Sequence, residues 1–224
     1  MTLLEAIAAR HSVRSYTEEK IQGHSLSALQ SAIHQYNQES GLNMQLCLDD
    51  PATFSGGLAR YGKFENTRNY IALVGEKGST LEETCGYYGQ KLVLLAQQLG
   101  LNTCWVALTF SKRKSKKVIQ IKPGQKLLMV IAIGYGASQG TSRQTKPIES
   151  LCQSAAPLPD WFSRAMEAVQ LAPTARNQQS FTFTLTENVV SANPGSGFYS
   201  KTNLGIAKCH FEIAAEGTDW HWNP

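Results

Sequence analysis

Residues 127–135 read Leu-Leu-Met-Val-Ile-Ala-Ile-Gly-Tyr, a run of nine residues without a single charge. An apolar run of this length, rich in β-branched side chains, predicts a strand at the centre of a sheet. A second strand is predicted over 69–75 (NYIALVG), where β-branched and aromatic residues again dominate. Met44–Leu48 alternates in character and predicts a short third strand.

The longest helical pattern runs from Thr80 to Gly100, with leucines and alanine recurring at helical spacing and a glycine as a natural stop. A helix is also predicted over 2–9, where Thr2 and Glu5 have the spacing of a capping box. Further helices are predicted at 25–36, 160–171 and 202–216, a strand at 180–186, and a connection over 137–160. The totals are four or five strands and five or six helices.

A chain of 224 residues with 42% hydrophobic and 17% charged residues can bury a substantial core. Its most apolar segment, 91–110, is interrupted by glutamines, glycine and asparagine, which does not suit a membrane span. The first residues lack the features of a signal peptide, because Glu5 and Arg10 break their apolar run. We therefore expect a cytoplasmic protein.

The five cysteines are widely spread and none has CxxC spacing, so we expect reduced thiols and no metal site. The net charge of +4 is uneven, with a basic run at 112–117 (KRKSKK). Such a run favours either a solvated helix face or nucleic-acid binding. The absence of interleaved aromatic residues favours the solvated face.

Several common signatures are absent: the chain has no GxxxxGK[ST], no GxSxG and no HExxH. Gly134–Gly140 follows a predicted strand, as a dinucleotide-binding loop would. Its third glycine comes one residue late and no helix pattern follows, so it is not a Rossmann fingerprint.

The segment 10–14 (RHSVR) ends the first predicted helix with two guanidinium groups, an imidazole and a hydroxyl. Arginine forks match phosphate oxygens in bidentate geometry, so Arg10, His11, Ser12 and Arg14 are candidate phosphate ligands. By composition alone, an exposed arginine pair is more often an ordinary surface feature.

A second polar segment, 173–181 (PTARNQQSF), links a predicted helix to a predicted strand. The carboxamide of Asn177 can hydrogen-bond the edge of a planar heterocycle. A simple helix-to-strand turn explains the segment equally well.

Together these segments resemble the nitroreductase family of flavoproteins. The resemblance rests on RHSVR at 10–14, GLNTCW at 100–105, IGYG at 133–136, RQTKP at 143–147 and PTARNQQSF at 173–181. It covers most of the chain and implies an α+β fold, with a central mixed or antiparallel sheet flanked by helices.

The resemblance also implies FMN as cofactor, with NAD(P)H as electron donor and a nitroaromatic or quinone-like acceptor in a ping-pong reaction. The chemistry belongs to the flavin, so we nominate no catalytic side chain. The residues implied at the phosphate and ribityl end are Arg10, His11, Ser12 and Arg14, with Arg143 or Lys146. Those implied at the ring are Pro173, Thr174, Ala175 and Asn177, and those with backbone amides near N5 are Ala107 and Leu108.

One departure from the family pattern is that the segment 173–181, which we call the asparagine segment, lies near the carboxyl end, after the predicted central strand. The spacing of Gly89, Gly100 and Trp105 is also nearly repeated by Gly205, Gly217 and Trp222. We therefore expect a single unit over 1–224 made of two fused pseudo-repeats, about 1–146 and 147–224. Such a pseudo-dimer, monomeric or weakly self-associating, would hold one complete flavin site.

Two other functions remain open at this stage. One is a flavin-binding protein without turnover, and the other is an anion- or nucleic-acid-binding module that uses the run at 112–117. The sequence also leaves open the physiological substrate and the choice between NADH and NADPH.

Overall fold

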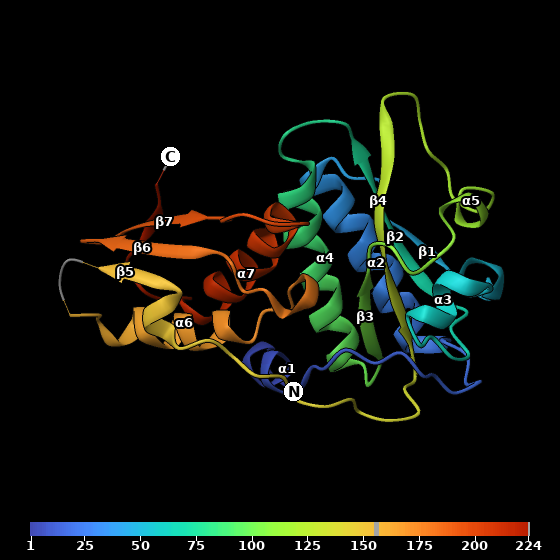
Figure 1. Ribbon diagram of the computed structural model, residues 1–224, viewed down its shortest axis with the longest axis horizontal. Helices are drawn as coiled ribbons and strands as arrows, with labels where there is room; N and C mark the ends of the chain where they lie inside the picture. Colours follow the sequence, from blue (N-terminus) through green and yellow to red (C-terminus); the bar gives the residue numbers. More distant parts are fainter. Residues whose placement is uncertain (155–156, 224) are drawn as a thin grey trace. The chain divides into compact units, whose positions relative to one another are not determined.

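The computed structural model describes residues 1–154 and 157–223, which form two compact units (Figure 1). Unit 2 consists of residues 9–81 and 91–142. Unit 1 consists of residues 1–8, 82–90 and the described part of 143–224. The fold is α+β, as predicted, with one antiparallel and one mixed sheet.

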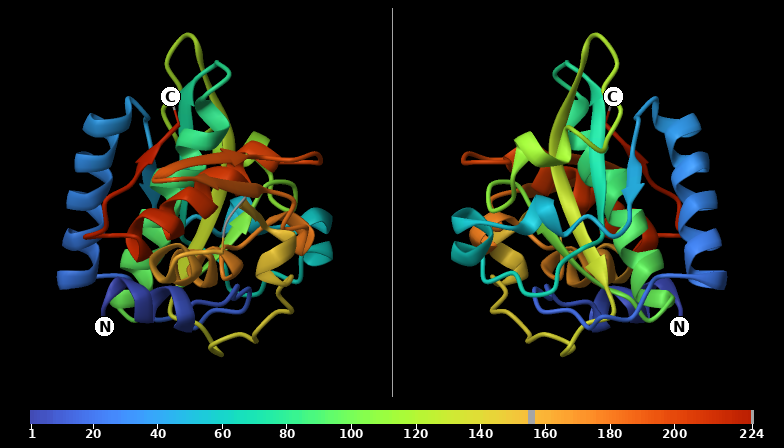
Figure 2. Two further views of the ribbon diagram at one scale, coloured as in Figure 1. Left: turned by 90° about the vertical axis from the view of Figure 1, so that its left-hand side faces the viewer. Right: turned by 90° about the vertical axis from the view of Figure 1, so that its right-hand side faces the viewer.

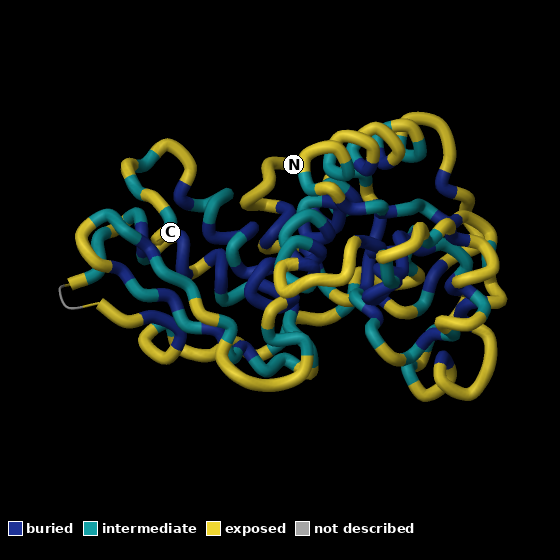
Figure 3. The backbone as a smooth tube through the Cα atoms, turned by 90° about the horizontal axis from the view of Figure 1, so that it is seen from above, coloured by how far each residue is buried: buried dark blue, intermediate teal, exposed yellow. Residues whose placement is uncertain are grey.

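Unit 2 contains a four-stranded antiparallel sheet in the order β1-β2-β4-β3. Its strands are β1 (Gln45–Cys47), β2 (Tyr70–Glu76), β3 (Asn102–Val106) and β4 (Gln125–Gly134). The predicted central strand is confirmed, because β4 pairs with β2 on one side and β3 on the other. Burial is nearly continuous along β2 and β4, as the apolar runs require (Figure 3).

The helices of unit 2 are α2 (Gly23–Ser40), α3 (Gly57–Tyr61), α5 (Lys112–Ser115) and the second half of α4 (Leu81–Gln98), and η1 (Pro51–Phe54) is a 3-10 turn. Figure 2 shows α2 beside the strands of this unit. Asn37 on α2 fixes the start of β1, because its side chain exchanges two hydrogen bonds with the backbone of Met44, at 2.8 and 2.9 Å.

Unit 1 contains a mixed sheet in the order β5-β6-β7-β8, in which only the central pair is antiparallel. Its strands are β5 (Cys152–Ser154), β6 (Thr182–Thr186), β7 (Val189–Asn193) and β8 (His221–Trp222). Its helices are α6 (Asp160–Gln170), α7 (Ser200–Ala214), the first half of α4 and nearly all of α1 (Leu3–Ala9), and its 3-10 turns are η2 (Ile148–Ser150) and η3 (Ala175–Asn177).

The fully buried His210 on α7 ties three helices of unit 1 together. Its Nδ1 lies 2.8 Å from the carbonyl oxygen of Ala168 on α6, and its Nε2 lies 2.8 Å from Nε2 of Gln90 on α4. A carbonyl oxygen only accepts, so Nδ1 donates and Nε2 accepts from the glutamine amide. The imidazole is therefore a structural link between these helices.

The predicted capping box is confirmed: Thr2 N–H donates to Glu5 Oε2 at 2.7 Å, and Glu5 N–H donates to Thr2 Oγ1 at 3.2 Å. The helix predicted at 25–36 is longer at both ends and stops at Gly41, whose φ is 70°. Among the described residues, no helix combines the length and the apolar character needed to cross a bilayer.

The predicted strand count was too low, since eight strands are present in the described residues. The missed strands are β3, β5, β7 and β8, which have only two to five residues each. The connection predicted over 137–160 holds η2 and β5, and residues 155–156 of it lie outside the described part. β5 forms because parallel pairing with β6, rather than its own composition, satisfies its backbone.

Two glycines allow helices α4 and α7 to cross almost backbone to backbone in unit 1. A Cβ atom at Gly205 would lie 2.0 Å from the carbonyl oxygen of Glu83, and one at Gly86 would lie 2.2 Å from that of Thr202. Backbone atoms cannot rotate away as a side chain can, so any larger residue must push the helices apart.

We predict that Gly205→Ala lowers the free energy of unfolding by about 3 kcal/mol, the upper part of the range for overpacking. Urea denaturation measures this. Gly57→Ala is the matched control, because a Cβ there meets nothing within 4 Å, and it should leave stability nearly unchanged. Equal stability of the two variants would show that the helices separate without cost.

Candidate functional site

The arginine segment, residues 10–14, lies along β3 in unit 2 as an extra extended stretch. Ser12 forms a parallel bridge with Thr103, and Val13 N–H donates to the Thr103 carbonyl oxygen at 3.0 Å. Val13 is buried in the core, whereas Ser12 and Arg14 on either side of it are exposed. The alternation of an extended chain thus turns the hydroxyl and one guanidinium outward.

Tyr16 fixes the position of the end of the arginine segment. Its hydroxyl donates to the carbonyl oxygen of Val13 at 2.7 Å, and its backbone bridges to Gly136 after β4. Burial raises the pKa of the Tyr16 hydroxyl well above its ordinary value, so it stays a neutral donor. The family-like IGYG stretch therefore serves here to hold the arginine segment in place.

Asn102, a buried residue that the sequence did not single out, positions the loop 136–140 over the segment. Its Oδ1 accepts from Gly136 N–H and its Nδ2 donates to Gln139 Oε1, both at 3.0 Å. Gly140, with a φ of 74°, comes so close that a Cβ there would lie 2.8 Å from the Cβ of His11. The only available signal for Asn102 was its place in GLNTCW.

Arg10 and Arg14 create a positive electrostatic potential at β3. Burial raises the pKa of the Cys104 thiol, while Arg14, Arg10 and a hydrogen bond with Ser12 act in the opposite direction. Arg10 itself is only 3% exposed. Two guanidinium groups near one strand create a strong local preference for an anion.

Ala107 and Leu108 follow the carboxyl end of the same strand. Ala107 is half-buried and Leu108 is 65% exposed. Ala107 is four positions beyond Thr103, so it lies about 13 Å along β3 from the position paired with Ser12, at 3.3 Å per residue.

The other nominated residues lie in unit 1, where the segment 173–179 has an unusual backbone. Three of its non-glycine residues, Arg176, Asn177 and Gln179, have left-handed φ angles of 51°, 56° and 44°. Such conformations are strained and persist only where the surroundings enforce them, often at ligand sites.

Gln179 enforces this conformation and is 2% exposed. Its Oε1 accepts from Lys146 N–H at 3.0 Å, and its Nε2 donates to Asn177 Oδ1 at 3.1 Å and to the Gln144 carbonyl oxygen at 3.2 Å. Its own N–H donates to Thr174 Oγ1 at 3.2 Å. One amide thus joins 144–146 to 174–179.

Three nominated residues also act as anchors of these segments. Asn177 Nδ2 donates to the Gln144 carbonyl oxygen at 2.8 Å, and Lys146 Nζ donates to that of Gln179 at 3.1 Å. Arg143 donates to the Leu171 carbonyl oxygen just after α6, and burial lowers its pKa. Their contact with a cofactor remains a prediction.

Unit 1 also holds four buried polar atoms without a hydrogen-bond partner among the described residues. They are Arg143 Nε, Gln178 Oε1, Thr202 Oγ1 and Asn203 Nδ2. Asn203 lies against the asparagine segment, because its Oδ1 accepts from Ala175 N–H at 3.0 Å. Such atoms are rare in native proteins, and a bound water, ion or ligand is the usual partner that completes them. Thr202 and Asn203 were missed because they lie in an ordinary helical pattern.

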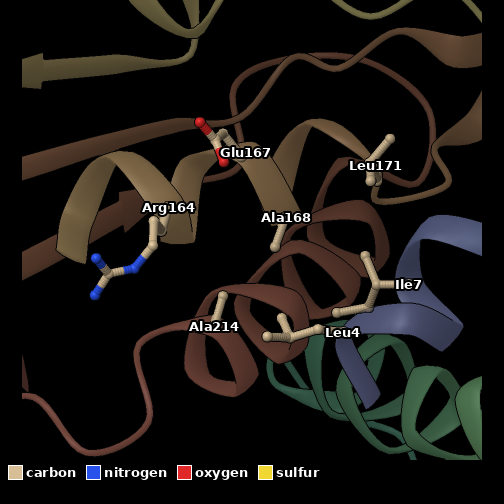
Figure 4. A pocket seen from close by; sticks show the side chains of 7 residues that line it. All are labelled: Leu4, Ile7, Arg164, Glu167, Ala168, Leu171 and Ala214. Carbon is tan, nitrogen blue, oxygen red and sulfur yellow. The ribbon is translucent and has the colours of Figure 1, made fainter. Parts of the chain in front are cut away.

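The five cysteines are buried and unbridged. Within the described part of the chain, no three His, Cys, Asp or Glu residues cluster as metal ligands. A groove of about 240 Å³ in unit 1 is lined mostly by aliphatic side chains of α1, α6 and α7, with Arg164 and Glu167 among them (Figure 4). It includes none of the nominated residues.

Comparison with known proteins identifies the family. Residues 2–215 match the sequence model of a family described as "Putative TM nitroreductase". The chain belongs to this nitroreductase family. No curated protein sequence matches it significantly.

Solved structures with the same fold include nitroreductases from several bacteria. A "putative nitroreductase" of Thermotoga maritima matches 96% of this chain and 83% of its own, with 24% identity and a TM-score of 0.68. A "putative nitroreductase in complex with FMN" from Desulfovibrio desulfuricans matches 70% of this chain and 98% of its own, with 19% identity and a TM-score of 0.54. A "Putative NADH dehydrogenase/NAD(P)H nitroreductase" of Parabacteroides distasonis matches 66% of this chain and 95% of its own, with 22% identity and a TM-score of 0.53.

We predict that Gln179→Leu lowers the free energy of unfolding by about 2 kcal/mol, because it removes the hydrogen bonds that a buried amide makes with partly buried groups of 144–146 and Asn177. Thermal unfolding measures the loss, and faster proteolytic cleavage within 173–179 should accompany it. Gln153→Leu, at an exposed position of β5, is the control. An unchanged cleavage rate in Gln179→Leu would contradict the anchoring role.

Proposed function

We propose that this nitroreductase-family protein is an FMN-dependent oxidoreductase that takes electrons from NAD(P)H and passes them to flat acceptors such as nitroaromatics or quinones. The observation that carries the proposal is the fixed arginine segment on β3, in a chain that belongs to this family. The FMN complex of a protein with the same fold supports the choice of cofactor.

Arg10, His11, Ser12 and Arg14 would hold the phosphate. The pairing with Thr103 keeps their backbone fixed before any ligand arrives, which reduces the entropy lost on binding. Guanidinium and hydroxyl donors suit a phosphate dianion. Ala107 and Leu108, at the other end of β3, would present backbone N–H groups towards the reacting edge of the ring.

Pro173, Thr174, Ala175 and Asn177 would line the ring from unit 1, and Arg143 or Lys146 would help to hold the phosphate and ribityl end. The partnerless Gln178 Oε1, Thr202 Oγ1 and Asn203 Nδ2 include both donors and acceptors, as the polar edge of a heterocycle requires. FMN when bound supplies hydride and electron transfer, and this chain supplies position and charge. No side chain needs to act as an acid or base.

We further propose that the chain is a fused pseudo-dimer. The order α2-β1-β2-α4-β3 recurs as α6-β6-β7-α7-β8. The glycine after each long helix has the same conformation, with φ of 77° at Gly100 and 79° at Gly217, and the following strand carries Trp105 or Trp222. Two of the related structures match almost fully yet cover only 66% and 70% of this chain, which agrees with extra sequence taken from a second copy.

The proposal predicts a yellow protein with one FMN per chain, whose visible bands disappear when NADH or NADPH is added without oxygen. Absorbance of released flavin against protein concentration gives the stoichiometry. A colourless chain that binds no added FMN would overturn the proposed function. Two tightly bound flavins per chain would overturn the pseudo-dimer alone.

Arg14→Gln should weaken FMN binding about ten- to hundred-fold, because a charged hydrogen bond contributes about 1.5–3 kcal/mol. Arg14 is exposed, so the substitution should not disturb the core. Titration of FMN fluorescence measures the affinity. Arg113→Gln, exposed in the same unit, is the control and should bind FMN normally. Wild-type affinity in Arg14→Gln would contradict its assignment to the phosphate.

A further inference from the structure

Charge is distributed very unevenly along the chain. The 65 residues from Thr84 to Ile148 contain ten lysines and arginines and no aspartate or glutamate, although the whole chain has 17 acidic residues. Residues 51–64 likewise contain Arg60 and Lys63 and no acid. Both stretches contribute to unit 2.

The structure brings part of these two stretches together. Ser111 N–H donates to the Thr53 carbonyl oxygen at 2.9 Å, and Lys114 Nζ donates to Ser55 Oγ at 2.7 Å. Gly62 packs against Thr109, where a Cβ would lie 2.7 Å from the threonine side chain. Figure 1 shows α3 and α5 on the same side of unit 2. We call residues 51–64 and 107–118 the basic face.

Six cations of the basic face are exposed: Arg60, Lys63, Lys112, Arg113, Lys116 and Lys117. The ion pairs Arg68–Asp49 and Lys208–Glu83 lie elsewhere in the chain. Positive charges grouped on one face attract anions strongly and increase the rate at which anions encounter the protein.

The basic face is also apolar at several points. Leu58, Tyr61, Leu108 and Val118 are 61%, 85%, 65% and 53% exposed, and they are four of the nine large hydrophobic residues exposed in the described chain. A charged surface that includes exposed apolar side chains is typical of a protein interface, in which the apolar atoms become buried. Nucleic acid fits less well, because phosphates gain nothing from leucine or valine, and Tyr61 is the one exposed aromatic ring of the basic face that could stack on a base.

We propose that the basic face is the docking surface for an acidic protein, an electron carrier of the one-electron type. This inference rests on the proposed function, because Leu108 of the basic face is also nominated beside the reacting edge of the flavin. Two reduced carriers would each lose one electron. With two protons from water, these electrons would convert one quinone to its hydroquinone without NAD(P)H, and FMN when bound would supply the electron transfer.

The test uses the FMN-loaded chain and an acidic plant-type [2Fe–2S] ferredoxin as the probe. Calorimetry with oxidised ferredoxin at low salt measures binding without turnover. Lys116→Glu/Lys117→Glu should weaken binding about tenfold, and Lys20→Glu/Lys77→Glu, exposed elsewhere in unit 2, should change it less than twofold. Each double variant lowers the net charge of the chain by the same amount, from +4 to 0. Tyr61→Ser should also weaken binding, and this loss should depend little on salt.

The kinetic measurement follows quinone reduction driven by reduced ferredoxin or by NADPH. The ferredoxin-driven rate should fall in the Lys116/Lys117 variant while the NADPH-driven rate stays unchanged. Equal effects of the two double variants, or no binding at low salt, would overturn the proposal. So would 20-base-pair DNA or phosphatidylserine vesicles that displace ferredoxin and lose affinity in the same variant. If the chain binds no FMN, the proposed function fails, yet calorimetry still decides the docking surface.

Discussion

The pairing of residues 12–13 with Thr103 is the constraint on which the candidate site depends. A segment with two arginines would otherwise leave the surface, because its charges prefer water and repel each other. Burial of Val13 and the Tyr16 hydrogen bond hold it against β3, so that the backbone is ordered by the core rather than by a ligand. Positive charge is thereby kept concentrated where an anion can neutralise it.

The asparagine segment of unit 1 is held in place in a different way. Left-handed residues and buried partnerless polar atoms are both unfavourable, and stable folding must offset them elsewhere in the unit. The close contact at Gly86 and Gly205 and the buried bridge at His210 supply that stability, since they join α4, α6 and α7 rigidly. Asn203 on α7 links these helices to the segment, because its Oδ1 accepts from Ala175 N–H.

Long periodic elements could be predicted from sequence because their signal is local: β4, β2, α4 and the capping box of α1 all appear where expected. Short strands such as β5 and β8 could not, because their pairing partners lie far away in sequence. The arginine and asparagine segments were visible as clusters of polar types. Asn102, Gln179, Thr202 and Asn203 were not, since only tertiary contacts distinguish a buried amide that positions a loop from an exposed one.

Each sheet has four strands, but the strand β4, which lies inside the sheet of unit 2, has no counterpart between β7 and β8 of unit 1. In unit 2, β4 lies between β2 and β3, and its end supplies Gly136 and the loop over the arginine segment. In unit 1, β7 pairs directly with β8 in parallel. β2 and β3 also run parallel to each other, because each is antiparallel to the strand β4 that lies between them. Within the described residues, the sheet of unit 1 therefore lacks the strand end that holds the arginine segment in unit 2. This difference favours our proposal of one phosphate site per chain.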